Sequence, residues 1–351
     1  MKNGKVLCRL VAFGVLITTG ALYGQSTSTT SDNFTNIGSS GAGFQKLWVG
    51  ARSAGLAGGF SALADDVTSL YWNPAGIARL QGISAIASYT KWHSDITHNF
   101  VGAVMPISER YRIGLGLTVV DYGTLRSAVI DPGASDRDAN AGTFNANDLS
   151  IGVSIAGALT DRFAFGATVK YLRNAILDLS ADGLAFDAGS LYQTDFYKLK
   201  ISLALTNLGS DRSFQGNSLS ILAKDDKLNT TAQLLDARLV TSDFALPLSF
   251  RIGIGTDVFQ GEDPDQKLNI DLDFSANSDG PERYNAGAEY IWNDIVAFRA
   301  GYAFNHDQMG LGLGAGFKYK SEDFLGQIDY GFNTTKDLGD IHVVTITANF
   351  P

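Results

Sequence analysis

The chain has 351 residues and a formal net charge of −9, from 36 acidic and 27 basic side chains. This acidic balance argues against nucleic acid as a partner. A single cysteine, Cys8, excludes a disulfide framework. The sequence has no apolar run of about 18 residues, so no membrane-spanning helix is predicted.

Residues 1–24 are predicted to be a secretory signal peptide. Three basic residues in the first nine positions precede an apolar run at 10–17, and small residues follow at Gly20, Ala21 and Gly24. The apolar run is too short to cross a bilayer. Cys8 lies at the start of this run and not after it, which disfavours a lipoprotein anchor. Cleavage would remove three basic residues and the only cysteine, leaving a net charge of −12 in place of −9.

Residues 25–81 lack strand periodicity, and we expect an N-terminal extension followed by a plug. Glycines at positions 50, 55, 58 and 59 allow close backbone approach and positive φ in a confined space. Asp65 and Asp66 precede a helix-compatible stretch at 67–71, and acids favour a helix N-terminus. Arg52 is expected to pair with Asp65 or Asp66 and so to fix the plug to itself or to the wall.

A second short turn is predicted after Trp72. Asn73 precedes Pro74 and is therefore disfavoured in the helical region, so the chain should turn there. Pro74 can then open a short helical turn through Ala75 and Gly76. Two roles fit the plug residues: holding the plug in place, or taking a direct part in gating or ligand passage.

From about residue 82 onward, apolar and polar side chains alternate with the period of a strand that has two different faces. In one example, Met309, Leu311, Leu313, Ala315, Phe317 and Tyr319 share a face, opposite a run of glycines. The second strand is ambiguous, because Val101 and Met105 compete with Phe100 and Val104 for the outward face. The predicted strands are 82–91, 96–106, 110–122, 147–158, 161–174, 183–192, 196–207, 247–259, 266–277, 282–292, 295–305, 309–320, 323–333 and 340–350.

Fourteen strands of about 10 residues suit a transmembrane barrel, which needs an even strand number and tilted strands of this length. With the C-terminus placed in the periplasm, the two longest connections, 123–146 and 208–246, both fall outside the cell. The connections near 106–109, 160–162, 293–294 and 320–323 are short and fall inside. We therefore predict an all-β fold: a 14-stranded antiparallel transmembrane β-barrel, residues 82–351, with a small N-terminal plug that contains short helical turns.

A periplasmic β-sandwich or propeller is the soluble alternative, because its strands also have one apolar and one polar face. Two features favour the membrane barrel. The polar face is rich in glycine, which suits a crowded interior, and aromatic residues cluster near strand ends, as in the interface girdles of membrane barrels. The last strand ends in an aromatic residue, Phe350, and resembles the insertion signal read by the barrel-assembly machinery; Pro351 departs from that pattern. The predicted location is the outer membrane of a Gram-negative-type cell, in contact with its lipid.

One part of the plug segment carries a family resemblance. It reads Gly-Ala-Arg-Ser-Ala-Gly-Leu-Ala-Gly-Gly-Phe from Gly50, Ala-Asp-Asp from Ala64, and Tyr-Trp-Asn-Pro-Ala-Gly from Tyr71. These strings, together with residues 91–96, closely resemble the PorV/PorQ family of the FadL-like outer-membrane barrels. The resemblance implies a hatch with an Asn-Pro-Ala motif inside a fourteen-stranded barrel. It marks as hatch residues Arg52, Gly55, Gly58, Gly59, Asp65, Asp66, Tyr71, Trp72, Asn73, Pro74, Ala75 and Gly76.

The resemblance also implies a function. PorV-like barrels serve type IX protein secretion: they engage a very large translocon barrel, bind cargo proteins through C-terminal signal domains, and shuttle them to a surface attachment complex. PorQ-like relatives belong to that attachment machinery. On this hypothesis the chain is a non-enzymatic adaptor whose extracellular loops 123–146 and 208–246 contact the translocon and cargo.

The alternative is a FadL-type channel for hydrophobic small molecules or fatty acids. A ligand would enter from outside, displace the hatch near Asn73, and leave through the wall. Phe44, Leu47, Trp48 and Phe60 could then contact the ligand, although plug packing alone would also explain them. A general porin is disfavoured because a plugged lumen obstructs diffusion.

No catalytic, cofactor or metal site is predicted. The glycines at 55–59 lack the spacing of a phosphate-binding loop. His93 and His98 lie five positions apart, which is not a zinc spacing. The acidic segment 131–138 could attract calcium but reads more simply as solvated loop charge. No nucleophile, base and orienting group fall together on adjacent predicted strands.

Overall fold

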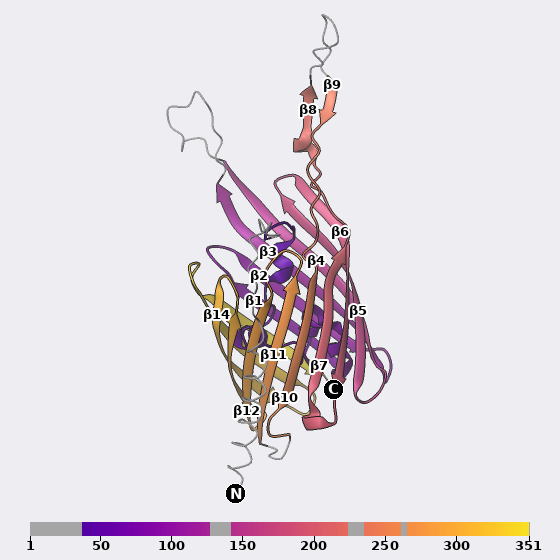
Figure 1. The fold of residues 1–351 in the computed structure, drawn as a ribbon, viewed down its shortest axis with the longest axis vertical. Coiled ribbons are helices and arrows are strands. Elements are labelled where there is room, and N and C mark those ends of the chain that lie inside the picture. The colour runs from indigo at the N-terminus through magenta and orange to yellow at the C-terminus, as the bar shows by residue number, and fades with distance from the viewer. Residues whose placement is uncertain (1–36, 127–141, 224–234, 261–264, 351) are drawn as a thin grey trace, which may run out of the picture.

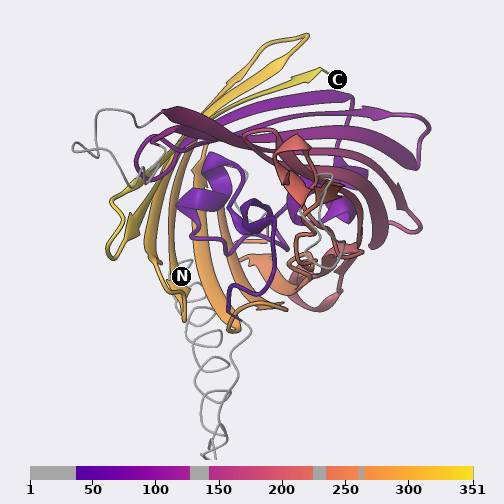
Figure 2. The same ribbon diagram turned by 90° about the horizontal axis from the view of Figure 1, so that it is seen from above.

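The computed structural model describes residues 37–126, 142–223, 235–260 and 265–350. The predicted signal peptide, the cleavage region and the acidic segment 131–138 lie outside these residues. Fourteen strands form one closed antiparallel barrel (Figures 1 and 2). In chain order they are β1 (Ile83–Lys91), β2 (Thr97–Pro106), β3 (Tyr111–Arg126), β4 (Thr143–Ala158), β5 (Phe163–Ile176), β6 (Leu179–Gln193), β7 (Lys200–Gly209), β10 (Ser249–Asp257), β11 (Gln266–Asn277), β12 (Arg283–Trp292), β13 (Val296–Phe304), β14 (Met309–Lys320), β15 (Leu325–Thr335) and β16 (Ile341–Phe350).

Each predicted strand corresponds to one barrel strand, so the predicted fold class is confirmed. Neighbours in sequence pair along the wall, and β1 pairs with β16 to close it, with Ile83 opposite Phe350. The largest boundary differences are four residues: β3, β4 and β6 run beyond the predicted limits at one end of the barrel, and β7 begins at Lys200 and not at 196, because residues 196–198 form a short helical turn at the other end. Membrane thickness sets a minimum strand length and does not stop a hairpin from continuing into water.

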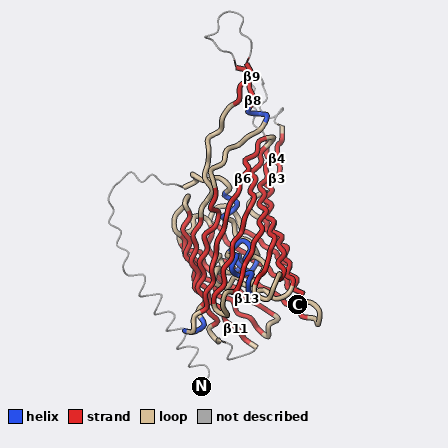
Figure 3. The backbone as a smooth tube through the Cα atoms, turned by 90° about the vertical axis from the view of Figure 1, so that its right-hand side faces the viewer, coloured by secondary structure: helices blue, strands red, loops and turns tan. Residues whose placement is uncertain are grey.

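Two short strands were not predicted. β8 (Ser220–Ala223) and β9 (Leu235–Arg238) form a separate two-stranded sheet within the long connection between β7 and β10. This hairpin projects away from the barrel at the end that carries the long loops (Figures 1 and 3). Short turns join the strands at the opposite end, as is typical of the periplasmic side of outer-membrane barrels. We therefore refer to these two ends as extracellular and periplasmic.

The outer surface of the barrel carries the apolar side chains of the alternating pattern. On β14, Leu313 and Phe317 are exposed on the outside, while the glycines that precede them, Gly312 and Gly316, are buried on the inside. Met309 departs from the predicted face: it is only 5% exposed and packs inside the barrel. The register between β14 and β15 shifts between Met309 and Gly312, and such a bulge redirects the side chains on one side of it.

The ambiguity of the second strand has a structural explanation. Val101 and Met105 are about half exposed on the outer face of β2, whereas Phe100 and Val104 are buried on the inner face. Both faces of β2 are therefore apolar, because the inner face contacts the plug and not a water-filled lumen. Alternation of polarity disappears wherever a strand is buried on both sides.

The plug occupies the lumen and consists of short helical turns (Figures 2 and 3). These turns are η1 (Gly43–Lys46), α2 (Ala51–Gly55), α3 (Ser69–Trp72) and η2 (Pro74–Arg79); η3 (Phe196–Lys198) and η4 (Asn217–Leu219) lie in loops of the barrel. Positive φ at Ala57 and Gly58 ends the α2 turn. Asn73 is extended, with φ −158° and ψ 107°, and separates α3 from η2 as the sequence predicted. No helix among the described residues is long and apolar enough to cross a membrane.

Candidate functional site: the plug and its attachment to the wall

A seam of glycines lets the plug backbone touch the barrel wall. A Cβ added to Gly301 would lie 2.2 Å from the carbonyl carbon of Leu56, and one added to Gly59 would lie 2.6 Å from the amide nitrogen of Gly287. Neither position has room for a side chain, so the backbones of wall and plug are in direct contact. The predicted close approach at Gly59 is present, and its counterpart is a row of inner-wall glycines: Gly287, Gly301, Gly312, Gly314 and Gly331.

Two wall carboxylates on β11 bind four consecutive amides of the plug. Asp273 accepts hydrogen bonds from the first two amides of residues 60–63, and Asp271 accepts from the last two, with N···O distances of 2.6–2.9 Å. Each of these hydrogen bonds satisfies a buried backbone donor that would otherwise cost about 1–3 kcal/mol. These carboxylates were not singled out from the sequence, although they fall on the polar face of the strand predicted at 266–277.

Arg52 joins the plug to itself and to the wall. Its guanidinium group contacts Asp65 at 2.6 Å and Asp66 at 3.1 Å, so the predicted ion pair is present with both acids. It also makes a bidentate contact with Glu289 of β12, at 2.9 Å for each of two N···O pairs. Glu289 lies 237 positions away in the sequence, which is why the wall partner was not identified.

The network continues along the inner wall beyond Glu289. Arg299 of β13 donates to Glu289 at 2.8 Å and to Asp329 of β15 at 2.7 Å, and all three side chains are almost fully buried. Removing one member of a buried, hydrogen-bonded charge network leaves an uncompensated charge and is strongly destabilising. The first half of the plug is therefore tied to three wall strands through Arg52.

The pKa values of the two neighbouring plug carboxyls, Asp65 and Asp66, are shifted in opposite directions. Burial opposes ionisation of Asp65, but the charges of Arg52 and Lys200 outweigh it and hold the pKa of Asp65 below its ordinary value. For Asp66, burial dominates over the attraction of Arg52 and raises the pKa. Burial also opposes the charge of Arg52, yet its three acidic neighbours raise its pKa well above the usual value.

The Asn73–Pro74 turn is a wall contact. The Asn73 side-chain amide donates to the Ser202 hydroxyl at 2.7 Å and to the Ser190 carbonyl at 3.0 Å, while its oxygen accepts from the Ala75 amide at 3.0 Å. One amide therefore fixes its own turn and links it to β6 and β7. Asn73, Pro74 and Ala75 of the predicted hatch motif pack against the wall glycines Gly166 and Gly189, whereas Gly76 packs against the plug itself: a Cβ there would lie 2.2 Å from the carbonyl oxygen of Ala64.

Tyr71 and Trp72 tie the plug segments to one another. The Tyr71 hydroxyl lies 2.6 Å from the carbonyl oxygens of both Gln45 and Leu47, and the Trp72 indole donates to the Val49 carbonyl at 2.9 Å. These bonds hold residues 45–49 against α3. In the structure, the hatch residues marked by the family resemblance therefore make contacts within the plug and between the plug and the wall.

The side chains proposed from sequence to contact an apolar ligand are engaged in packing. Phe44 is buried beside Leu172 and Leu246, with Leu47 packed against that group. Trp48 and Phe60 belong to a second cluster, in which Phe60 meets the Trp72 ring edge-on at 5.8 Å between centroids. These residues do not form one shared pocket: Phe44 and Phe60 fall in separate clusters.

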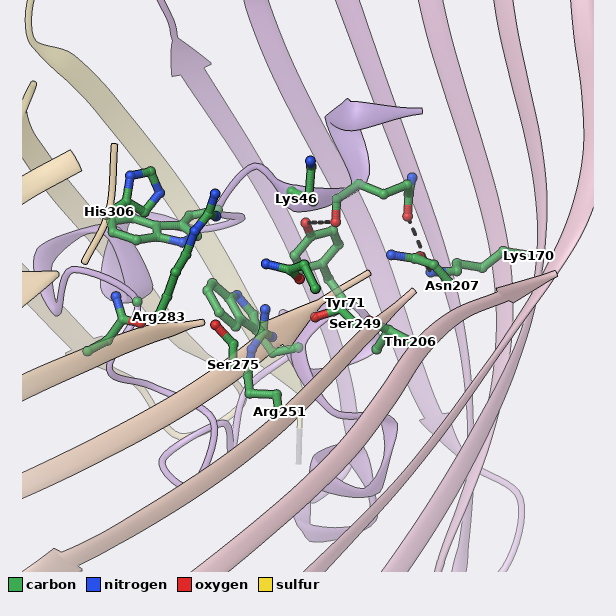
Figure 4. A pocket seen from close by; sticks show the side chains of 16 residues that line it. Lys46, Tyr71, Lys170, Thr206, Asn207, Ser249, Arg251, Ser275, Arg283 and His306 are labelled. Carbon is green, nitrogen blue, oxygen red and sulfur yellow. Dashed lines mark hydrogen bonds between the residues drawn. The ribbon is translucent and has the colours of Figure 1, made fainter. Parts of the chain in front are cut away.

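The plug separates two spaces of different character. On the periplasmic side, a cavity of about 780 Å³ is lined by charged groups that include Arg52, Asp65 and Glu289. On the extracellular side, a much smaller cavity of about 30 Å³ lies between the plug and β7, β10, β11 and β12 (Figure 4). Within the described part of the chain, no group of three or more His, Cys, Asp or Glu side chains is placed to hold a metal ion.

Comparison with solved structures identifies the fold. No protein-family model and no curated protein matches the sequence. The CymD monoaromatic hydrocarbon channel is similar over 86% of this chain and 97% of its own, with TM-score 0.56 and 15% identity. The Pseudomonas putida toluene transporter TodX is similar over 86% of this chain and 96% of its own, with TM-score 0.54 and 12% identity. A Pseudomonas aeruginosa FadL homologue gives TM-score 0.51 at 14% identity, over 86% and 98% of the two chains.

These findings define the class of protein. The chain is a closed 14-stranded antiparallel barrel with the fold of FadL-like outer-membrane barrels, located in the outer membrane of a Gram-negative-type cell.

Proposed function

We propose that the protein is a FadL-type outer-membrane channel that admits hydrophobic small molecules past a movable plug. The observation that supports this most strongly is the attachment of the plug to opposite sides of the wall, by the Ala54 carbonyl to Asn333 on β15 and by the Asn73 amide to the Ser190 carbonyl on β6. A plug held across the lumen in this way obstructs passage, so transport requires these contacts to rearrange. The neighbours named as a hydrocarbon channel and a toluene transporter support the choice of ligand class.

In this proposal the aromatic residues of the plug meet the ligand only after the plug has moved. Phe60 is fully buried and Phe44 is 2% exposed in the closed state. A hydrophobic solute that replaces one of their packing partners would offset the loss of buried apolar area, worth about 25 cal/mol per Å².

A disulfide between plug and wall tests whether the plug must move. Leu70 of α3 and Gly116 of β3 suit it, because the Leu70 Cβ lies 3.7 Å from the position of a Gly116 Cβ, close to the mean Cβ separation of a disulfide. The double variant Leu70→Cys with Gly116→Cys should lose at least about tenfold in toluene uptake by expressing cells when oxidised, and recover on reduction. The single variant Leu70→Cys is the control. Equal uptake in the oxidised and reduced states would contradict the proposal.

A second candidate rests on the sequence strings from Gly50, Ala64 and Tyr71, which resemble the PorV/PorQ family. Under it, the protein is a type IX secretion adaptor that binds the translocon barrel and cargo proteins with C-terminal signal domains. The extracellular β8–β9 hairpin lies within the predicted contact loop 208–246; the other predicted contact loop, 123–146, lies largely outside the described residues. Affinity purification of the tagged barrel from solubilised outer membranes distinguishes the two. Recovery of a very large barrel or of secreted proteins with shared C-terminal domains favours the adaptor, and recovery of the barrel without them counts against it.

A further inference from the structure

The small cavity on the extracellular side of the plug is surrounded by basic side chains. Lys46 comes from the plug, Lys170 from β5, Arg251 from β10 and Arg283 from β12, and all four line the same space (Figure 4). The rest of the lining is mostly polar, from hydroxyl and amide groups of β7, β10, β11 and β12. A hydrocarbon chain would find few apolar contacts there, and a space of about 30 Å³ holds a compact group only.

Two of these four cations are neutralised directly and two are not. Lys46 pairs with Asp279 at 2.6 Å, and Lys170 pairs with Asp187 at 2.9 Å. Within the part of the chain that the structure describes, Arg251 has no hydrogen bond or ion pair. Its guanidinium group instead lies 4.4 Å from the centroid of the Trp72 ring.

Arg283 and Gln45 add buried donors without acceptors. The Nε atom of Arg283 is buried and has no hydrogen-bond partner. Gln45 is 6% exposed, and its oxygen accepts from the Lys170 ammonium at 3.2 Å, which fixes the orientation of the amide. The Gln45 Nε2 group is then left buried without a partner. An unsatisfied buried donor costs about 1–3 kcal/mol, so an acceptor placed within reach of these two donors would be stabilised.

The carboxylates that act on these arginines make no ion pair with them among the described residues. Asp273, whose charge acts most strongly on Arg251, accepts from plug amides through Oδ2, and its Oδ1 is buried without a hydrogen-bond partner. Asp307 faces Arg283 electrostatically but makes no ion pair with it among the described residues. His306 adds no charge at neutral pH, because burial lowers its pKa to about 4, and its Nδ1 accepts from the Met309 amide.

We propose that this cavity binds a compact oxyanion, such as phosphate, sulfate or a small dicarboxylate, between Arg251 and Arg283 of the wall and Gln45 of the plug. Guanidinium groups match the planar acceptor geometry of such anions, and the buried amide supplies a third donor. The bound anion would bridge plug and wall at the extracellular end, where Arg52 makes no contact. The site does not depend on the proposed transport function.

Tryptophan fluorescence of the full-length barrel in detergent tests the site. Trp48 and Trp72 line the cavity, so a background with Trp92→Phe and Trp292→Phe leaves only reporters at the site. We expect a saturable signal with inorganic phosphate or succinate at constant ionic strength, and at least tenfold weaker binding in Arg251→Gln and in Arg283→Gln. Lys320→Gln, which removes a cation of the periplasmic cavity, should bind as the parent does.

Three outcomes would overturn the proposal: no saturable response to phosphate, sulfate or succinate; a response to palmitate alone, which would indicate an amphipathic acid; or equal loss in Lys320→Gln, which would indicate non-specific charge attraction. Gln45→Leu keeps the charge and removes one donor, so it carries the test if an arginine variant fails to fold, as judged by heat-modifiable gel migration. If the barrel binds phosphate but expressing cells take up no toluene, the anion site stands and only the channel proposal is refuted.

Discussion

Whereas residues 51–66 of the plug meet carboxylates, amides and arginines of the wall, residues 67–78 meet aliphatic and aromatic side chains. The first group is held by β11, β12, β13 and β15 through Asp271, Asp273, Glu289 and their partners. The second packs as a single buried cluster against the opposite wall, with Val67, Leu70 and Ile77 beside Phe100, Val104 and Leu191. Charged hydrogen bonds to the wall are therefore confined to the first half, whereas the second half is held mainly by apolar burial, with the neutral hydrogen bonds of Asn73 added. The two halves should therefore respond to different perturbations.

Removal of the Glu289 carboxylate should lower the local stability of the plug more than any other change considered below. Glu289→Gln leaves Arg52 and Arg299 buried with less compensation, and we expect residues 51–63 to lose about 3–5 kcal/mol of local stability. Amide hydrogen exchange followed by mass spectrometry would show this as a loss of protection in 51–63, with 67–78 less affected. Glu282→Gln, an exposed position beside the same strand, is the control. An equal loss in both halves would show that the plug releases as one unit.

Truncation of an apolar wall side chain should lower local stability nearly as much, but in residues 67–78. Phe100 is 3% exposed and packs with Val67 and Leu70, so Phe100→Ala should cost about 3 kcal/mol through lost burial and the cavity left behind. Exchange should accelerate in 67–78 before 51–63. Val101→Ala, on the outer face of the same strand, should leave both segments protected. Faster exchange confined to 51–63 would refute the division into halves.

Acid should produce the smallest effect, and only in the charged half. Because the pKa of Asp65 is below its ordinary value in the folded protein, its contribution is complete above about pH 3.9 and is lost as the pH falls through the folded value. Asp66, with a raised pKa, changes in the opposite sense. Asp65→Asn should therefore flatten the acid dependence of protection in 51–55, and Asp66→Asn should steepen it. Asp65 is partly exposed to the periplasmic cavity, so the effect should stay below about 1 kcal/mol. Identical profiles for the two variants would rule out this assignment.

The contrast between the halves also explains what the sequence could and could not predict. Strands were predictable because lipid on one side imposes an alternation of apolar and polar side chains, which β14 shows at every position except its first residue, Met309. The β8–β9 hairpin lies beyond the lipid, so that constraint is absent there. Within the plug, Arg52 with Asp65 and Asp66 was predictable because the partners are 13 and 14 positions apart. Glu289 and the β11 carboxylates meet the plug only through the closed barrel, so no local pattern could reveal them.

The glycine seam sets the kind of motion by which the plug can open. At Gly287 and Gly301 the wall presents no side chain to the plug, and a Cβ there would overlap the backbone around Leu56 and Gly59. A change of side-chain rotamer, which takes picoseconds to nanoseconds, therefore cannot open this contact, because no side chain separates plug and wall here. Opening must instead carry a stretch of main chain away from the wall, a collective displacement of the kind that proceeds in microseconds to milliseconds. In the proposed channel, the rate of opening is therefore set by main-chain motion, and a permeating ligand must wait for that motion.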